Sequence, residues 1–141
     1  MTARQFLEPA RRLDWRIEKK CERIARMRAK LEKTNSNLTG MPRGGPGGDW
    51  TDADVAVLEY EEQIKAEIAR LCALKRRITE IISTVEESTL RDLLELRYLN
   101  NYRFEQIAVE MNFSYDYVRH LHKEALAAVQ VKLDTQKHID L

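Results

Sequence analysis

Two stretches of the chain repeat an apolar residue at every seventh position. In the first, from about Ala3 to Lys33, the repeat residues are Ala10, Ile17, Ile24 and Leu31, with Leu13 and Met27 at the companion position and Lys20 interrupting it. In the second they are Val57, Ile64, Leu71, Ile78 and Val85, with Tyr60, Leu74 and Ile81 as companions and Ile68 and Ile82 widening the stripe. This pattern is typical of helices that pack along one seam.

A glycine- and proline-rich segment, residues 35–51, separates the two heptad stretches. All five glycines of the chain lie in residues 40–48, and a helix cannot continue through a segment so rich in glycine and proline. Thr51, followed by Asp54, forms a capping box that starts the second helix. We therefore predict an all-α fold that begins with a long antiparallel, coiled-coil-like helical hairpin over residues 1–87, with its loop at 35–51.

Three further helices are expected, the first beginning at or near Ser88 as its N-cap and the last running from Ser114 to about Leu133. The stretch from Phe104 to Leu121 has the helix-turn-helix pattern, with five apolar packing positions filled by Ile107, Met111, Phe113, Val118 and Leu121. Ala108 is small at the crossing, Asn112 stands at the left-handed turn position and Ser114 caps the second helix. We predict a helix-turn-helix domain over residues 88–133 and a polar tail at 134–141. An ordinary αα-corner is the alternative.

The same region resembles region four of bacterial sigma factors. The resemblance rests on Leu93 to Tyr98, Phe104 to Ala108, Ser114 to Val118 and Ala125-Leu126, within a region of about forty residues. It implies a three-helix domain that reads a promoter element and docks on the RNA polymerase flap.

Two further segments are informative, the loop from Met41 to Gly45 between the two heptad stretches and the stretch from Glu95 to Asn100. Through them the whole chain is similar to a family of small phage and prophage proteins of uncharacterised function, related to the ArpU-type and RinA-type late-transcription regulators. This similarity implies a phage-borne transcription regulator.

The sigma resemblance implies a set of DNA contacts, only part of which this chain retains. Tyr115 stands at the first base-reading position, where primary sigma factors have arginine; Asp116 keeps the acidic position, Arg119 matches a basic contact and His120 replaces a glutamine. On an exposed helix face Arg119 suits guanine and Asp116 suits cytosine. The DNA-binding residues we predict are Arg103, Ser114, Tyr115, Asp116, Arg119, His120 and Lys123, of which Arg103 and Lys123 suit phosphates.

Positive charge gathers at the start of the chain. Residues 1–34 hold 11 Lys/Arg against 5 Asp/Glu, whereas residues 88–141 hold 7 against 8. Seven bases share two adjoining heptad positions of the first helix: Arg12, Arg16, Lys19, Arg23, Arg26, Lys30 and Lys33. This basic stripe is either a second nucleic-acid contact or a partner for Glu59, Glu61, Glu62 and Glu67 across the hairpin. We expect the second of these, in which the basic stripe pairs with the four glutamates.

Other chemistry has little support in the sequence. The glycine-rich loop lacks the Gly-Lys-Ser/Thr of a P-loop, and no catalytic triad, carboxylate pair or zinc-ligand spacing is present. Cys21 and Cys72 are expected as buried, reduced thiols. The longest apolar run, from Ala125 to Val129, is too short to span a membrane, and we expect no secretory signal. We expect neither enzymatic activity nor a cofactor.

The prediction is a DNA-binding transcription regulator of a phage or prophage that acts on double-stranded DNA in the bacterial cytoplasm. The alternative, favoured by the near-neutral charge of residues 88–141, is an interaction module that docks on host RNA polymerase or a sigma factor with little DNA binding of its own. A homodimer is compatible with either function. A structural helical protein of the virion is the third possibility.

Overall fold

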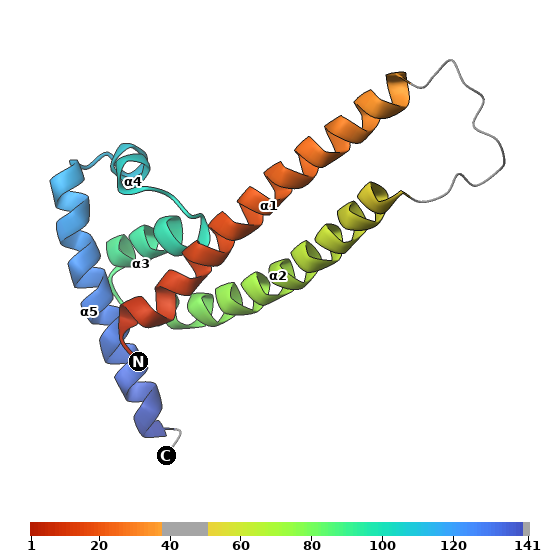
Figure 1. Ribbon diagram of the computed structural model, residues 1–141. Coiled ribbons are helices and arrows are strands. Elements are labelled where there is room, and N and C mark those ends of the chain that lie inside the picture. The colour runs from red at the N-terminus through yellow and green to blue at the C-terminus, as the bar shows by residue number, and fades with distance from the viewer. Residues whose placement is uncertain (38–50, 140–141) are drawn as a thin grey trace. The chain divides into compact units, whose positions relative to one another are not determined.

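The computed structural model describes residues 1–37 and 51–139, and every regular element in them is helical (Figure 1). The predicted all-α class is confirmed. In chain order the elements are α1 (Ala3–Asn37), α2 (Asp52–Ile82), α3 (Ser88–Leu94), the π-helical turn η1 (Glu95–Leu99), α4 (Phe104–Met111) and α5 (Tyr115–Ile139). Apart from its ends, the predicted loop at 35–51 lies outside the described residues.

The chain forms two compact units. Unit 1 consists of Met1–Asp14 and Leu71–Leu141, and unit 2 consists of Trp15–Arg70. Unit 1 therefore combines the first residues of α1 and the end of α2 with all of the later helices. The expected domain boundary between residues 87 and 88 stays a prediction about which parts fold independently.

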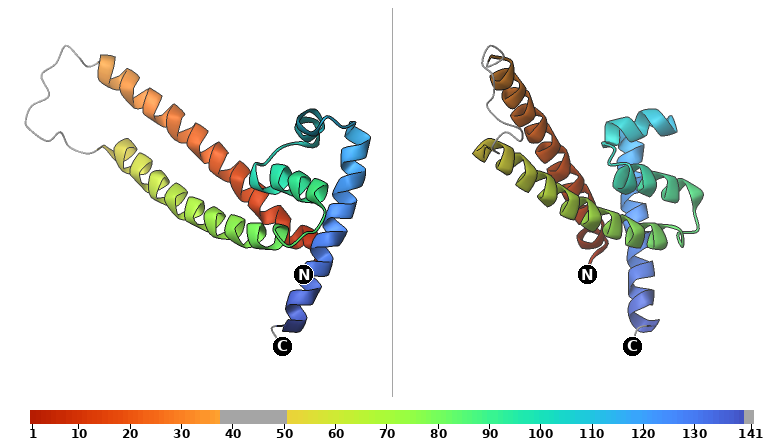
Figure 2. Two further views of the ribbon diagram at one scale, coloured as in Figure 1. Left: turned by 180° about the vertical axis from the view of Figure 1, so that it is seen from behind. Right: turned by 90° about the vertical axis from the view of Figure 1, so that its right-hand side faces the viewer.

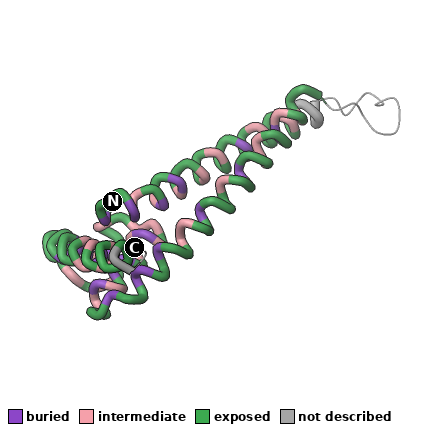
Figure 3. The backbone as a smooth tube through the Cα atoms, turned by 90° about the horizontal axis from the view of Figure 1, so that it is seen from below, coloured by how far each residue is buried: buried purple, intermediate pink, exposed green. Residues whose placement is uncertain are grey.

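In unit 2, segments of α1 and α2 run antiparallel. Lys20 Nζ lies 2.8 Å from Glu67 Oε1, and Arg28, further along α1, pairs with Glu61, which comes earlier on α2. Among the residues of this unit whose burial is described, Ile24, Val57 and Ile64 are buried, all at the seam positions of the heptads. Figure 3 shows such buried positions recurring along both long helices, with exposed positions between them.

Other predicted seam residues of unit 2 are less buried than their pattern indicates. Ile17, Met27, Leu31 and Tyr60 are only half-buried. Ile68, which we expected to widen the apolar stripe, is 43 % exposed, so that prediction was wrong. Two helices alone cover a narrow strip on each other, and residues that flank the strip stay in contact with water.

The predicted capping box at the start of α2 is present. The backbone N–H of Thr51 donates to Asp54 Oδ2 at 3.1 Å, and the N–H of Asp54 donates to Thr51 Oγ1 at 3.2 Å. Both bonds satisfy amide groups that have no partner within the helix. The helix therefore begins where the sequence indicates.

Unit 1 has a thicker core because α3 and α4 pack against α5, beside the ends of the two long helices (Figure 2). Its largest fully buried side chains come from every part of the unit: Leu7, Ile78, Ile82, Val85, Leu93, Leu94, Tyr98, Ile107, Val118 and Val129. In this unit Ala10, Leu13, Leu71 and Ile81 are also buried, as the heptad pattern predicts.

The segment after α3 widens into a π-helical turn. The N–H of Asn100 donates to the carbonyl of Glu95, five residues back, at 3.0 Å, and Asn101 ends the segment in a left-handed conformation with φ 58°. Asparagine tolerates this conformation better than most residues. Arg11 Nε also donates to Asn101 Oδ1 at 2.8 Å, so the stop predicted at Asn100-Asn101 is held by α1 as well.

Three helix boundaries differ from the prediction. Helix α1 continues to Asn37, past its expected end at about Lys33 and into the predicted loop. Ser88 is the first residue of α3 rather than its cap, because Glu87 holds the extended cap conformation and makes no side-chain capping bond. Instead, Arg91 Nη1 donates to the carbonyls of Val85 and Glu86, at 2.8 and 3.3 Å, and fixes the chain where it enters the helix.

Helix α5 continues six residues beyond the expected end at Leu133, to Ile139, and so runs into the predicted polar tail. The start of the chain contacts α5 just before this extension. The N–H of Ala3 donates to Gln130 Oε1 at 2.7 Å, and Gln130 Nε2 donates to the carbonyl of Met1 at 3.3 Å. The sequence pattern of α5 alone gave no sign of this contact with α1.

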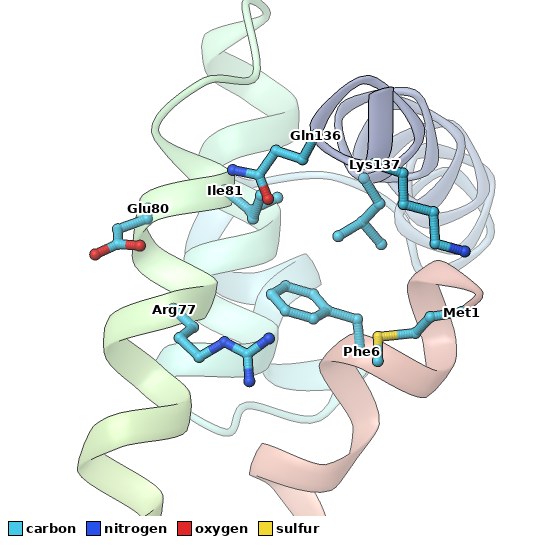
Figure 4. Close-up of a pocket in the computed structure, with 8 residues that line it drawn as sticks. Met1, Phe6, Arg77, Glu80, Ile81, Gln136 and Lys137 are labelled. Atoms are coloured by element: carbon cyan, nitrogen blue, oxygen red, sulfur yellow. The ribbon is translucent and has the colours of Figure 1, made fainter. Parts of the chain in front are cut away.

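A small pocket of about 190 Å³ lies among the start of α1, the end of α2 and the end of α5 (Figure 4). The ring of Phe6 points into it, with the Arg77 guanidinium 5.8 Å from the ring centroid. Ile81, Gln136 and Lys137 complete the walls. The pocket mixes apolar packing with single charges and brings no catalytic group of residues together.

Candidate nucleic-acid interface

Helices α4 and α5 are joined by a three-residue turn, residues 112–114. Asn112 adopts φ 59° and ψ 44°, the left-handed conformation predicted for it. The N–H of Phe113 then donates to the carbonyl of Ala108 at 3.0 Å and closes the end of α4. Ser114 Oγ accepts the N–H of Tyr117 at 3.2 Å, so the predicted cap of α5 is confirmed.

The five apolar positions of the predicted motif divide into two groups. Ile107, Val118 and Leu121 are buried, whereas Met111 and Phe113 are half-buried. Ala108, expected to be small at the crossing, is half-buried as well. Phe113 packs edge-on against Tyr117, with the ring centroids 5.0 Å apart. The turn therefore carries an aromatic pair at the surface while the two helices bury their aliphatic residues against each other.

All seven predicted DNA-binding residues are exposed. Two of them, Arg103 and Ser114, are the residues before α4 and α5, and the other five lie on the first turns of α5: Tyr115, Asp116, Arg119, His120 and Lys123. Val118, Leu121 and Ala125 are buried between these positions, so one side of α5 faces the unit and the other faces solvent. We call the five exposed residues of α5 the α5 face.

Tyr115 and Arg119 form one feature of the α5 face. The Arg119 guanidinium lies 5.8 Å from the centroid of the Tyr115 ring, and that ring meets Phe104 edge-on at 6.4 Å. Among the described residues Arg119 forms no ion pair. Its guanidinium donors therefore stay free for a ligand, while the contact with Tyr115 limits the orientations that the side chain samples.

Other residues of the α5 face differ in whether they form an ion pair. His120 Nε2 lies 3.2 Å from Glu124 Oε1, one turn further on, so an acidic neighbour already competes for this histidine. Lys123 makes no ion pair within the described part of the chain. At the start of α4, the backbone N–H of Arg103 donates to Gln106 Oε1 at 2.8 Å. Arg103 itself is exposed at the helix N-terminus.

His122 is the residue that the sequence reasoning missed. It is 6 % exposed, and its Nε2 shares a hydrogen bond with the Tyr98 hydroxyl at 2.7 Å. The ring of Phe104 meets it edge-on at 4.9 Å. Its position could have been found, because residues 118, 122, 125 and 129 recur at helical spacing on the inward side of α5.

The surroundings of His122 keep its ring neutral. Burial lowers its pKa from 6.5 to about 4, and the nearby positive charges of Arg97, Arg4 and Arg11 act in the same direction. Arg97 lies over Phe104, with the guanidinium 3.9 Å from the ring centroid, and burial lowers its pKa. Burial also raises the pKa of Tyr98. These residues form a polar cluster behind the α5 face.

The described residues offer little for other chemistry. They contain no group of three or more histidine, cysteine or acidic residues placed to hold a metal ion. No described helix combines the length and the apolar character that crossing a bilayer requires. Cys21 and Cys72 are both exposed, so the expectation of buried thiols was wrong. Each cysteine directly neighbours a seam position or its companion, Lys20 or Leu71, and therefore faces outward.

Comparison with known protein families, curated proteins and solved structures finds no significant match to this chain. On the α5 face a guanidinium, an ammonium, a carboxylate, a phenol and an imidazole share one exposed helix surface.

Proposed function

We propose that the protein binds double-stranded DNA through the α5 face and regulates transcription. The observation that carries the proposal is the division of α5 into a buried side and an exposed polar side directly after a capped, left-handed turn. In a helix-turn-helix protein, the helix after such a turn lies in the major groove, and its first residues reach the base edges.

The side chains of the α5 face match the chemistry of base pairs and phosphates. Arg119 donates to guanine O6 and N7, and Asp116 accepts from the amino group of cytosine. Lys123, further along the helix, and Arg103, at the start of α4, suit phosphate oxygens, which fix the register without reading sequence. The phage or prophage setting, and with it the bacterial cytoplasm, rests on the sequence resemblance alone.

A second candidate function is docking on RNA polymerase or a sigma factor. The outer surface of α4 favours it, because Val109 is 82 % exposed and shares an open groove with Tyr102, Glu105 and Glu110. An apolar residue among carboxylates suits a basic protein surface better than a phosphate backbone. The near-neutral charge of residues 88–141 points the same way.

A paired binding assay separates the two functions. The full chain is titrated into random-sequence duplex DNA at low salt, and in parallel it is used to capture purified bacterial RNA polymerase. We expect duplex binding that weakens with salt, because phosphate contacts release counterions. Polymerase capture that Val109→Asp abolishes, without any duplex binding, would support the docking function and reject the proposal.

A further inference from the structure

Unit 2 carries a basic groove that the proposed function does not use. The groove is open, has a volume of about 440 Å³ and is lined by the bases Arg16, Lys19, Lys20, Arg23 and Arg26. Two aromatic residues, Trp15 and Tyr60, complete its lining. Arg16 and Arg26 are ten residues apart on α1, so the basic surface extends for about 15 Å along the helix.

The acids of α2 leave most of this charge uncompensated. Across the hairpin Lys20 pairs with Glu67 and Arg28 pairs with Glu61, and neither base belongs to the basic stripe. For the four stripe residues that line the groove, Arg16, Lys19, Arg23 and Arg26, the expected pairing with Glu59, Glu61, Glu62 or Glu67 was wrong. Of the stripe residues that line the groove, Arg16 and Arg26 make no ion pair within the described residues.

The other two stripe residues in the groove are only lightly engaged. Lys19 pairs with Glu22 of its own helix at 3.5 Å, and both side chains are half exposed. Arg23 Nη1 donates to the Tyr60 hydroxyl at 2.8 Å, and its guanidinium lies 5.4 Å from that ring, so its positive charge stays without a carboxylate. Glu22 and Glu67 are thus the acids paired with the five bases of the groove.

Trp15 gives the groove a second chemical character. It is 58 % exposed, although tryptophan is usually well buried. It follows the seam residue Ala10 by five positions, which turns it away from the seam, so packing between the helices does not explain it. Lys19 Nζ lies 6.0 Å from its ring centroid, and a flat apolar ring is therefore presented to solvent beside a row of cations.

We propose that this groove binds single-stranded nucleic acid, with a base stacked on Trp15 and phosphates held by Arg16, Lys19 and Arg26. Exposed aromatic rings beside a positively charged groove are the common means of binding single strands, because every base has a face that can stack. In a duplex those faces are already stacked on each other. RNA and DNA share the required chemistry. This activity is separate from the proposed function of the α5 face and does not depend on it.

The first test follows the fluorescence of Trp15. Trp50→Phe leaves Trp15 as the single tryptophan of the chain. We expect oligo(dT) or oligo(rU) of about 15 nucleotides to quench this fluorescence, and Trp15→Ala to raise the dissociation constant about five- to hundredfold, measured by anisotropy of a labelled strand. An unchanged dissociation constant for Trp15→Ala overturns the stacking contact. Tighter binding of a duplex of the same length overturns the assignment to single strands.

The second test concerns the charges. Replacing Arg16, Lys19 and Arg26 with glutamine breaks no ion pair between the helices, and it should lower the salt dependence of oligonucleotide binding by about two logarithmic units per tenfold change in salt. The matched control replaces Lys33, Lys65 and Arg70, three exposed bases outside the groove. An equal loss in both variants means non-specific attraction and overturns the site.

The α5 face provides an internal control. Arg119→Ala should leave oligonucleotide binding unchanged, and the groove variant should leave the sequence preference for duplex DNA unchanged, so either proposal can fail alone. If no strand binds at low salt and an acidic polypeptide such as polyglutamate protects the groove arginines from modification instead, the groove is a protein-binding surface and the proposal is wrong.

Discussion

Both units contain segments of the same two heptad helices, yet those segments are buried to different depths. In unit 2 the heptads bury Ile24, Val57 and Ile64, whereas unit 1 contains all the other buried apolar residues of the described chain. The difference lies in what covers the helices. Among the described residues of unit 2 they have only each other, whereas the core of unit 1 also includes α3 and α5.

A heptad pattern therefore determines which residues face a partner helix, but it does not determine how deeply those residues are buried. The difference in core thickness also determines which unit buries polar side chains and which unit exposes them. The buried hydrogen bond between His122 and Tyr98 lies in the thicker unit, while the exposed Trp15 and the unpaired groove arginines Arg16 and Arg26 lie in the thinner one. A two-helix layer leaves most of its surface in water and available for binding.

The largest expected effect is on stability. Leu93→Ala, at a fully buried position of unit 1, should lower the free energy of unfolding by about 2–5 kcal/mol, because it removes apolar contacts and leaves a cavity. Ile64→Ala in unit 2 should cost about 2 kcal/mol or less, because neighbouring groups and water can fill the space. Urea unfolding followed by circular dichroism measures both. Equal costs would contradict the difference in core thickness.

The next effect is a pH dependence that belongs to unit 1 alone. Because the folded-state pKa of His122 is lowered to about 4, the unfolded chain binds a proton below pH 6.5 while the folded chain does not. The free energy of unfolding is therefore not reduced by His122 above pH 6.5. It falls as the pH drops from 6.5 toward 4, by about 3 kcal/mol in total.

His122→Gln should remove this dependence while keeping a hydrogen-bond partner for Tyr98. The matched control is His120→Gln on the exposed side of the same helix, which should keep the slope. Thermal unfolding between pH 4 and 7 compares the two variants. A slope that survives in His122→Gln would mean that another group causes it.

A smaller effect distinguishes the two proposed binding surfaces, the α5 face of unit 1 and the basic groove of unit 2. Arg119→Ala should weaken duplex binding at a cognate site by about 1–3 kcal/mol and relax base preference there, whereas Lys123→Ala should weaken all duplexes alike and lower the salt slope by about one. Neither variant should alter single-strand binding by unit 2. Identical behaviour of the two variants on different duplexes would make Arg119 a phosphate contact.

The smallest effect concerns the ion pairs of unit 2. Lys20 and Glu67 are 24 % and 13 % exposed, whereas Lys19 and Glu22 are both 51 % exposed. Double-mutant cycles should give a coupling free energy of about 1 kcal/mol for the first pair and less than about 0.5 kcal/mol for the second, since water screens exposed pairs. A larger coupling for Lys19 and Glu22 would contradict the burial of the inner pair.

Much of the fold follows from periodicity and capping. The seam from Val57 to Val85, the Thr51 capping box, the left-handed Asn112 and the Ser114 cap were all predictable, because each depends on residues close in sequence. The extension of α5 to Ile139 was not, since its residues Gln136 and Lys137 line a pocket with Met1 and Phe6, which are distant in sequence.

The candidate sites show the same limit. Exposure of the α5 face could be predicted from helical spacing, but the bond between His122 and Tyr98 joins two helices whose packing the sequence does not specify. The pairing of Lys20 rather than the basic stripe depends on the rotation of α1 against α2 within unit 2. A helical wheel does not determine which of two adjacent heptad positions of α1 lies closer to α2.

The most direct test of duplex recognition by the α5 face is selection from a random pool of DNA duplexes. We expect the full chain to enrich a short common sequence, and Arg119→Ala to lose the preference for guanine at one position of it while keeping the others. Enrichment of the same sequence by both proteins would show that Arg119 reads no base. A wild-type chain that enriches no sequence at all would contradict DNA recognition by this helix.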